Sequence, residues 1–315
     1  MTGSAQSGVM SAAAAISTER LTKDYGSGRG LFDLDLEVRH GEIMGFLGPN
    51  GADKSTAMRL LLGLAAPTSG SARLLGLDAV RDGLALRRQV GYLADDFGLY
   101  PRLTGATLLD YFARLRGGIS AGRIGELADR FDAQLDRPVR ELSTGNRQKI
   151  GLIQAFMHDP QLLILDEPIA GLDPLVQHRF HELLSETRGE GRTVLLSSHT
   201  LSEIDRVADR VAIIRSGRLV VLDAVDRLRS VAVRRWEIEF ARPPADDEFR
   251  RIVGVRQTDI TGNRLRIAFE GSANEIVKMA ARHEVIDIGT RDGDLEEIFL
   301  RYYQDDEHDD DGIES

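Results

Sequence analysis

The sequence contains no cysteine, and this absence excludes disulfide bonds, cysteine-ligated zinc sites and iron–sulfur clusters. Long hydrophobic runs are missing as well. The longest apolar stretch, around Leu60 to Ala66, is far shorter than the roughly 18–20 residues that cross a bilayer, so we expect no transmembrane helix. The first residues lack the basic start and apolar core of a secretory signal. We interpret residues 1–15 as a disordered leader.

Basic residues are outnumbered, because 40 Lys and Arg stand against 50 Asp and Glu and give a net charge of −10. An acidic chain as a whole does not attract nucleic acid, so we expect no nucleic-acid partner. Seven of the last eleven residues are acidic, and we expect residues 304–315 to form a disordered acidic tail. The hydrophobic fraction of 42% is sufficient for a sizeable buried core.

Short apolar runs alternate with helical patterns from residue 16 to about residue 226, which is typical of an α/β fold with a largely parallel sheet. Four runs have the length and composition of strands buried on both faces: Ile43–Leu47, Leu162–Leu165, Thr193–Leu196 and Val211–Ile214. A more helical stretch occupies residues 96–160, where Leu108, Leu109, Phe112 and Leu115 recur at helical spacing.

Residues 231–303 show a different pattern and predict a small accessory α+β domain. The segment Trp236–Phe240 alternates with period two, and Gly262-Asn263 lies between two apolar runs as a hairpin turn would. Ser272 and Glu275 form a capping box before a helix. The resulting order of strand, helix, strand, strand, helix, strand indicates a split βαβ unit.

A glycine-rich loop follows the first apolar run and precedes a helical one, which is the context of a phosphate-binding loop. It consists of Gly48, Pro49, Asn50, Gly51, Ala52, Asp53, Lys54, Ser55 and Thr56. Successive backbone N–H groups at a helix start form a nest for anionic oxygens. Lys54 is placed to reach the β- and γ-phosphates of ATP, and the Ser55 hydroxyl is placed on Mg²⁺.

Asp53 departs from this loop pattern, which has glycine immediately before the lysine. A carboxylate there adds a Cβ and a negative charge beside the phosphates. Two unit charges about 4 Å apart interact by roughly 4 kcal/mol at an effective dielectric constant near 20. We expect Asp53 to weaken ATP binding by repulsion and by pairing with Lys54, unless Mg²⁺ compensates.

Two carboxylates follow the apolar run Leu162–Leu165. Asp166 is placed to hold Mg²⁺ through a water molecule, and Glu167 is placed to orient and deprotonate an attacking water. A second anion site is indicated where Ser143 and Gly145 precede a helical run, because a helix N-terminus attracts negative charge. Taken alone, each pattern also fits an ordinary strand end or helix start.

Read in order over about 200 residues, these motifs resemble the ATP-binding subunit of ABC transporters. Tyr25 resembles the adenine-stacking aromatic of that family, and Leu142–Asn146 resembles its signature sequence. Asp166-Glu167-Pro168 followed by Gly171–Pro174 resembles the Walker B and D-loop run, and His199 resembles the switch histidine. The form of the signature and the ending Leu295–Phe299 are most similar to the exporter-type ABC-2 branch.

The resemblance implies a P-loop ABC cassette, with a mixed sheet core and a helical subdomain, that binds ATP and Mg²⁺ and hydrolyses ATP. Two such subunits, identical or different, sandwich the nucleotide. Ser143 and Gly145 then act on the ATP held by the partner, Asp173 crosses the interface, and His199 senses the γ-phosphate. A separate transmembrane permease subunit holds the pair at the cytoplasmic face of the membrane.

Asp95 is a second departure, because it occupies the position where the family has the glutamine that links Mg²⁺ to the permease groove. A carboxylate still accepts a hydrogen bond from Mg²⁺-bound water, so we take Asp95 as a metal-site candidate. The surrounding Asp95, Phe97, Leu99 and Tyr100 are our candidate docking surface for the permease.

Two other functions are compatible with the sequence to different degrees. Asp53 raises the alternative of a nucleotide-binding or regulatory subunit with weak or absent ATPase activity. A soluble ABC ATPase of DNA repair or translation is disfavoured, because such proteins need long coiled coils, zinc-binding cysteines or two cassettes in one chain. The transported substrate is not encoded in this chain, since the translocation path lies in the permease.

Overall fold

The structure is a computed structural model that describes residues 14–95, 100–231 and 233–291. Residues 1–13 of the expected leader, Phe97 and Leu99 of the candidate docking surface, the Leu295–Phe299 segment and the acidic tail lie outside the described residues. Ala15, which we placed in the leader, is buried, and its carbonyl accepts a hydrogen bond from Leu75 N–H. Ala15 directly precedes the first strand, so the expected disordered leader does not extend to this residue.

The chain divides into two compact units between Leu222 and Asp223. The first unit is built on a six-stranded sheet of order β11-β10-β4-β9-β8-β7, and the five strands β10, β4, β9, β8 and β7 pair in parallel. Their bounds are β4 Ile43–Leu47, β7 Val90–Leu93, β8 Leu162–Leu165, β9 Thr193–Ser198, β10 Arg210–Arg215 and β11 Arg218–Ala224. The four predicted apolar strands are therefore confirmed.

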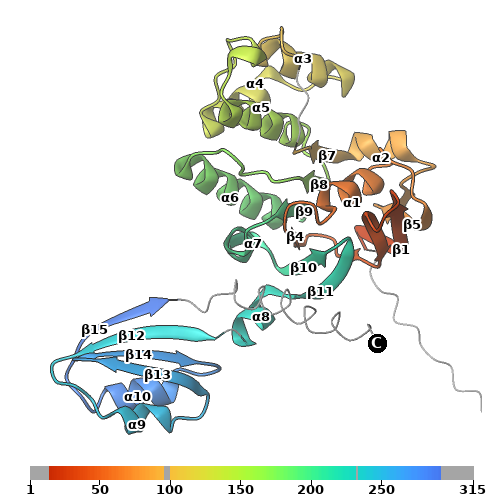
Figure 1. The fold of residues 1–315 in the computed structure, drawn as a ribbon. Coiled ribbons are helices and arrows are strands. Elements are labelled where there is room, and N and C mark those ends of the chain that lie inside the picture. The colour runs from red at the N-terminus through yellow and green to blue at the C-terminus, as the bar shows by residue number, and fades with distance from the viewer. Residues whose placement is uncertain (1–13, 96–99, 232, 292–315) are drawn as a thin grey trace, which may run out of the picture. The chain divides into compact units, whose positions relative to one another are not determined.

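A second, antiparallel sheet lies beside the first (Figure 1). It comprises β1 Ile16–Asp24, β2 Gly30–Leu34, β3 Glu37–Val38, β5 Ser69–Leu74 and β6 Leu77–Asp78. Helix α1, Lys54–Leu61, contributes Met58 and Leu61 to one hydrophobic core with Leu31 of β2 and Phe46 of β4. The helix that follows the glycine-rich loop is thus fixed by apolar contacts with both sheets, which fixes the loop in turn.

Side-chain caps set the starts of four helices of this unit. Thr104, Ser120, Ser143 and Asp173 each accept a hydrogen bond from the backbone N–H three residues later, at 3.0–3.2 Å. The capped helices are α3 Gly105–Leu115, α4 Ala121–Phe131, α5 Thr144–Phe156 and α6 Pro174–Gly189. Such caps satisfy donors that the helix itself leaves unpaired. Two shorter helices are α2 Gly83–Gln89 and α7 Leu201–Val207.

Helices α3, α4 and α5, with the short 3₁₀ helix Val139–Glu141, form the helical part of this unit (Figure 1). Leu108 and Leu109 of the predicted apolar stripe are buried on α3. Leu115 also lies on α3, as the prediction has it, but it is the last residue of the helix and is 65% exposed.

Among its described residues, the second unit has an antiparallel sheet of order β13-β14-β12-β15 and three helices. Its elements are α8 Val225–Val231, β12 Arg234–Phe240, α9 Asp246–Arg250, β13 Val255–Thr261, β14 Arg264–Phe269, α10 Asn274–Ala280 and β15 Val285–Arg291. From β12 onwards the element order is the one that the sequence predicts. Gly262, with φ +63°, and Asn263 form the predicted two-residue hairpin turn.

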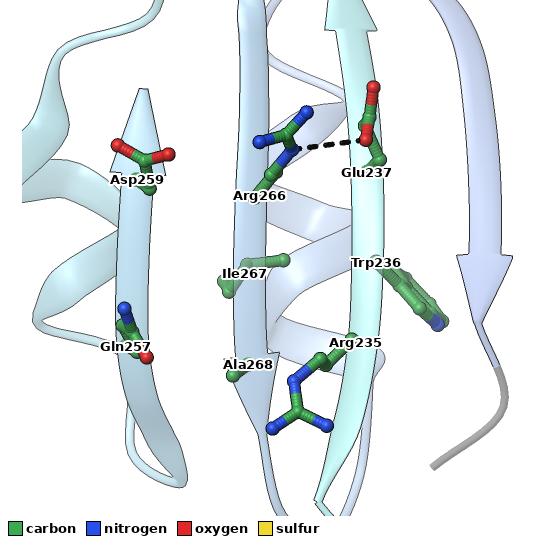
Figure 2. A pocket seen from close by; sticks show the side chains of 8 residues that line it. All are labelled: Arg235, Trp236, Glu237, Gln257, Asp259, Arg266, Ile267 and Ala268. Atoms are coloured by element: carbon green, nitrogen blue, oxygen red, sulfur yellow. Dashed lines mark hydrogen bonds and ion pairs between the residues drawn. The ribbon is translucent and has the colours of Figure 1, made fainter. Parts of the chain in front are cut away.

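One face of this sheet packs on α9 and α10 through Ile238, Phe240, Phe249, Leu265 and Ile276. Figure 2 shows the opposite face, where Arg235, Glu237, Asp259 and Arg266 project from three strands. It forms a polar hollow of about 400 Å³, and Arg266 pairs there with Glu237 at 3.2 Å. The alternation of apolar and charged residues along each strand explains the two faces.

Within the part of the chain that the structure describes, no helix is long and apolar enough to cross a membrane. This finding agrees with the lack of long hydrophobic runs in the sequence.

The carbonyl of Val90, at the start of β7, accepts hydrogen bonds from two side chains far away in the sequence. Arg116 Nη2 lies 3.3 Å from it, and His158 Nε2 lies at the same distance. Burial and the neighbouring Arg116 guanidinium lower the pKa of His158 to about 4. The imidazole is therefore neutral at neutral pH and donates from Nε2, while the permanent charge is on Arg116.

This pKa predicts acid sensitivity. Between pH 6.5 and about 4 the unfolded chain binds a proton at His158 that the folded chain does not, so the free energy of unfolding falls as the pH falls. The contribution is at most about 1.4 kcal/mol per pH unit, reduced by the partial exposure of the ring. We expect His158→Gln, which retains an N–H donor, to show a smaller loss of thermal stability between pH 7 and pH 4.5 than the unmodified protein.

His178→Gln is the matched control, because it makes the same chemical change at an exposed position of α6. Thermal unfolding followed by circular dichroism at both pH values measures the difference. An identical acid-induced decrease in Tm for the His158 and His178 variants would contradict the assignment.

Candidate functional site

The glycine-rich loop connects the end of β4 to α1 in a conformation that its glycines permit. A Cβ on Gly48 would lie 2.6 Å from the carbonyl oxygen of Ile214, so no other residue fits there. Gly51 has φ +83°, in the left-handed region that glycine enters without strain. The N–H of Gly48 donates to the carbonyl of Ser198 at 3.2 Å and ties the loop to the end of β9.

Asp53 adopts the backbone conformation of the glycine that it replaces. Its φ of 67° and ψ of 26° are left-handed, a region that aspartate and asparagine enter more readily than most residues. Its Oδ1 accepts a hydrogen bond from the Thr56 hydroxyl at 2.9 Å. The expected pairing with Lys54 is therefore not the one that the structure shows, because the hydroxyl of the first helical turn is nearer to this carboxylate.

Lys54 instead turns back over the loop. Its Nζ donates to the carbonyls of Gly48 and Pro49, at 2.6 and 3.2 Å, and lies 3.3 Å from Glu167 Oε1. The residue is 6% exposed. A buried ammonium needs such partners, since burial disfavours an unpaired charge.

One hydroxyl connects the two residues that follow β8, through the carboxylate of Asp166 and the backbone N–H of Glu167. Ser197 Oγ donates to Asp166 Oδ1 at 2.6 Å and accepts from the N–H of Glu167 at 2.9 Å. Asp166 is 1% exposed, and its Oδ2 has no hydrogen-bond partner among the described residues. An orphaned carboxylate oxygen at such a site fits a divalent cation or a water molecule bound to one.

The side chain of Glu167 lies between the two other predicted catalytic residues. Oε1 faces Lys54 Nζ, and Oε2 lies 2.9 Å from His199 Nδ1. The His199 side chain is half exposed, whereas that of Glu167 is 13% exposed. A carboxylate held in this way by a cation and an imidazole has a fixed direction in which to accept a proton.

A cavity of about 290 Å³ lies over the loop. It is lined by Pro49, Asn50, Gly51, Asp53, Lys54, Ser55, Thr56, Asp95, Asp166 and Glu167. Four carboxylates face one ammonium group there, so the cavity favours a bound cation. Within the described residues no cluster of three or more carboxylate or imidazole groups could hold a metal on its own. The set fits Mg²⁺, which takes one or two protein carboxylates and completes its shell with phosphate and water.

Seven predicted site residues are not part of this cavity lining: Gly48 and Ala52 of the loop itself, His199, which contacts Glu167, and four residues from other segments. Tyr25 is 50% exposed, and its ring centre lies 5.5 Å from Lys23 Nζ. Ser143 and Gly145 are at the start of α5, and Asp173 caps α6. Asp173 also pairs with Lys149 at 3.6 Å. One chain therefore brings the loop, Asp95, Asp166 and Glu167 together, but it does not bring the signature segment to them.

Residues 31–170 match the sequence profile of the family described as ABC transporter. Over 297 residues the chain is 32% identical to the Nod factor export ATP-binding protein I of Paraburkholderia xenovorans, and the match covers 91% of this chain and 96% of that protein. The chain belongs to the ABC transporter ATP-binding family. The recognition made from the sequence motifs is thereby confirmed.

Other similar proteins agree with this assignment. A bacitracin transport ATP-binding protein, BcrA of Enterococcus faecalis, is 40% identical over 65% of this chain and 68% of its own length. A solved ATP-binding subunit of an ABC transporter superposes with a TM-score of 0.62 at 30% identity, covering 68% of this chain and 92% of that one.

A dimeric cassette, MJ0796, solved with ADP and phosphate, has the same TM-score at 20% identity and covers 67% of this chain and 98% of its own. At this identity the likeness shows the fold alone. Together with the first solved subunit it confirms the predicted P-loop cassette fold.

Sequence reasoning missed two residues of the ABC site. Ser197 bonds the Asp166 carboxylate and the backbone N–H of Glu167, and the predicted strand ended one residue before it. Gln148 donates to the carbonyls of Glu167 and Pro168, at 3.0 and 3.1 Å. It stands in the run after the signature segment, where we gave it no role. A hydroxyl residue ending a buried strand was a usable signal for Ser197, whereas no sequence signal points from Gln148 to Glu167.

The geometry of Asp53 separates two effects that a single variant would mix. Asp53→Asn keeps a residue that tolerates the left-handed backbone and removes the charge, while Asp53→Gly removes charge and Cβ together. We expect Asp53→Asn to bind Mg-ATP about 10- to 100-fold more tightly than the unmodified protein, because repulsion of the polyphosphate is relieved. Titration calorimetry at fixed Mg²⁺ measures the dissociation constants.

Asp247→Asn is a suitable control, since Asp247 is exposed in the second unit and loses the same charge. Equal dissociation constants for the unmodified protein and the Asn variant, with a tighter Gly variant, would assign the effect to the Cβ. Equal constants for all three would show that the loop accommodates the carboxylate at no cost.

Proposed function

We propose that this chain is the ATP-hydrolysing subunit of an ABC exporter. One observation carries the proposal: Glu167 is held between Lys54 and His199 at the edge of a cavity that the phosphate loop lines. Glu167 and His199 follow the ends of β8 and β9, and Lys54 begins α1. Their contacts support the proposed catalytic roles. Asp166, with its unpartnered oxygen, supplies the metal side of the same cavity.

In this proposal the loop N–H groups bind the phosphates of ATP, and Lys54 leaves the carbonyls of Gly48 and Pro49 for the β- and γ-phosphates. Ser55, Asp166 and Asp95 hold Mg²⁺, which neutralises charge that develops on the phosphates. Glu167 accepts the proton of the attacking water, and His199 contacts the γ-phosphate. Tyr25 stacks on the adenine ring.

We further propose that two such subunits, identical or different, close over the nucleotide. Ser143 is exposed at the start of α5 and lies outside the cavity of its own chain, so it is available to the ATP of a partner. Ser143, Gly145 and Asp173 then complete the partner's site. The dimeric cassette of the same fold supports this arrangement.

The direction of transport is proposed from the relatives. One of them is named for Nod factor export and another for bacitracin transport, and both match this chain over its cassette. We propose that a separate permease subunit binds this chain and holds it at the cytoplasmic face of the membrane. The alternative of a nucleotide-binding or regulatory subunit with weak or absent ATPase activity is not favoured, because the contacts of Glu167 with Lys54 and His199 support a role in hydrolysis.

Glu167→Gln tests the assigned base. It keeps the size of the side chain and its contact with His199 but removes proton acceptance, so we expect turnover to fall about 100-fold or more while ATP binding is retained. ATP then accumulates on a dimer that does not open. Phosphate release and size-exclusion chromatography in ATP measure the two effects.

Glu182→Gln is the matched surface control, because Glu182 is exposed on α6 and pairs there with His178. Unchanged turnover in the Glu167 variant of an ATP-hydrolysing preparation would remove that residue from the role.

A composite site makes turnover depend on assembly. We expect the hydrolysis rate per subunit to rise with protein concentration in dilute solution. A sharper form uses two inactive variants: Lys54→Ala, which spoils the loop, and Ser143→Asp, which keeps a good helix cap but repels phosphate. A mixture of the two forms dimers with one intact site, and we expect it to regain activity that neither variant has alone.

Each variant assayed alone at the same total protein concentration should remain inactive. A rate per subunit that is independent of concentration, together with a mixture that stays inactive, would contradict the sandwich.

A further inference from the structure

The backbone of Glu167 is in a conformation that a glutamate rarely adopts. Its φ is 47°, in the left-handed region, where a side chain with a Cβ is strained. Such a conformation persists only where surrounding contacts hold it, and it is concentrated at functional sites. The direction of the Glu167 carboxylate therefore depends on whatever fixes its two flanking peptide groups.

Two side chains fix those groups. On the N-terminal side, the N–H of Glu167 donates to Ser197 Oγ of β9 at 2.9 Å. On the C-terminal side, Gln148 Nε2 donates to the carbonyl of Glu167 at 3.0 Å and to that of Pro168 at 3.1 Å. Ser197 belongs to the sheet that carries the site. Gln148 belongs to a different element, helix α5.

Helix α5 begins at the signature segment, and its start is in close contact with the loop after Glu167. A Cβ on Gly145 would lie 2.4 Å from the carbonyl oxygen of Gly171, so the two backbones touch. One turn further, Lys149 pairs with Asp173. Any movement of the start of α5 is thus passed to the segment from Glu167 to Asp173 by direct contacts.

We infer that Gln148 is a positioning residue that couples the signature helix of this chain to its own catalytic glutamate. The inference rests on the proposed function, in which the start of α5 binds the ATP of the partner subunit. When the start of α5 binds that ATP, the position of the helix is fixed. Gln148 then holds the carbonyl of Glu167, and the Glu167 carboxylate points toward the attacking water in the site of the same chain. Occupancy of the partner's site then raises the hydrolysis rate at this chain's own site without being essential for it.

The test uses two substitutions of Gln148 with opposite hydrogen-bonding character. Gln148→Glu has nearly the same shape but places a carboxylate against two carbonyl oxygens. Gln148→Lys keeps a donor on a slightly longer chain. We expect the Glu variant to lower kcat about 10-fold or more with KM within about twofold, and the Lys variant to stay within about threefold of the unmodified kcat.

Gln177→Ala is the matched control, because the Gln177 amide also donates to a backbone carbonyl, that of Leu172, at 3.0 Å, without touching Glu167. We expect its kcat to stay close to that of the unmodified protein. Combining Gln148→Glu with Glu167→Gln should add no further loss, since the first acts through the second. Similar kcat values for the Glu and Lys variants, a change in KM alone, or losses that multiply would each overturn the inference.

Hydrogen exchange provides a readout that does not need turnover. The N–H groups of Glu167 and Ala170 donate to Ser197 Oγ and to the carbonyl of Glu167. Peptides covering residues 166–172 should exchange faster in Gln148→Glu than in the unmodified protein. Their exchange should be unchanged in Gln177→Ala. If the unmodified protein does not hydrolyse ATP, the proposed function fails and exchange alone decides the coupling. Unaltered exchange in the Glu variant would overturn it.

Discussion

The parallel register of three neighbouring strands places the chemistry of this protein at one edge of a sheet. Leu47 of β4 pairs with Ser198 of β9, and Leu165 of β8 pairs with Leu196. The glycine-rich loop, the two carboxylates and His199 all follow directly after these paired positions. A shift of one residue in either pairing would turn alternate side chains to the other face of the sheet and separate Glu167 from Lys54. Most other contacts at the site depend on this alignment.

Negative charge is in excess at this edge of the sheet, and a bound cation would balance it. Lys54 and Asp166 are almost fully buried, and the cavity lining carries four carboxylates for one ammonium. Buried charges are costly unless they are paired and hydrogen-bonded. Lys54 meets this need with two carbonyls and Glu167, whereas one oxygen of Asp166 has no partner within the described residues. The arrangement favours a cation together with the polyphosphate that the cation accompanies.

Two residues of the site combine left-handed backbone with a side chain. Asp53 holds the glycine conformation of the loop while its carboxylate bonds Thr56, and Glu167 is held by Ser197 and Gln148. In each case the backbone strain is confined to one residue: Asp53 directly before α1, and Glu167 shortly after β8. None of the predicted site residues belongs to the second unit, which begins at Asp223. Its helices cover one face of the sheet, and the other face is an alternating array of charges in which Arg266 pairs with Glu237 and Arg264 with Glu239.

The sequence by itself determined the elements and the residue types of the site, because those signals are local. Short apolar runs between turn residues, the Gly262-Asn263 turn and the order of motifs each depend on neighbours along the chain. The predicted capping box of Ser272 and Glu275 is wrong, since α10 begins after Ala273 without a side-chain cap. The tertiary structure alone decided three contacts: the pairing of Asp53 with Thr56 instead of Lys54, the bonds of Ser197 Oγ to the Asp166 carboxylate and the Glu167 N–H, and the bond from Gln148 to the Glu167 carbonyl. Ser197 and Gln148 join segments 19 and more residues apart, and even the nearby choice at Asp53 depends on where α1 and the buried Lys54 are held. Such contacts exist only after the sheets and α5 have packed together, so no spacing in the sequence encodes them.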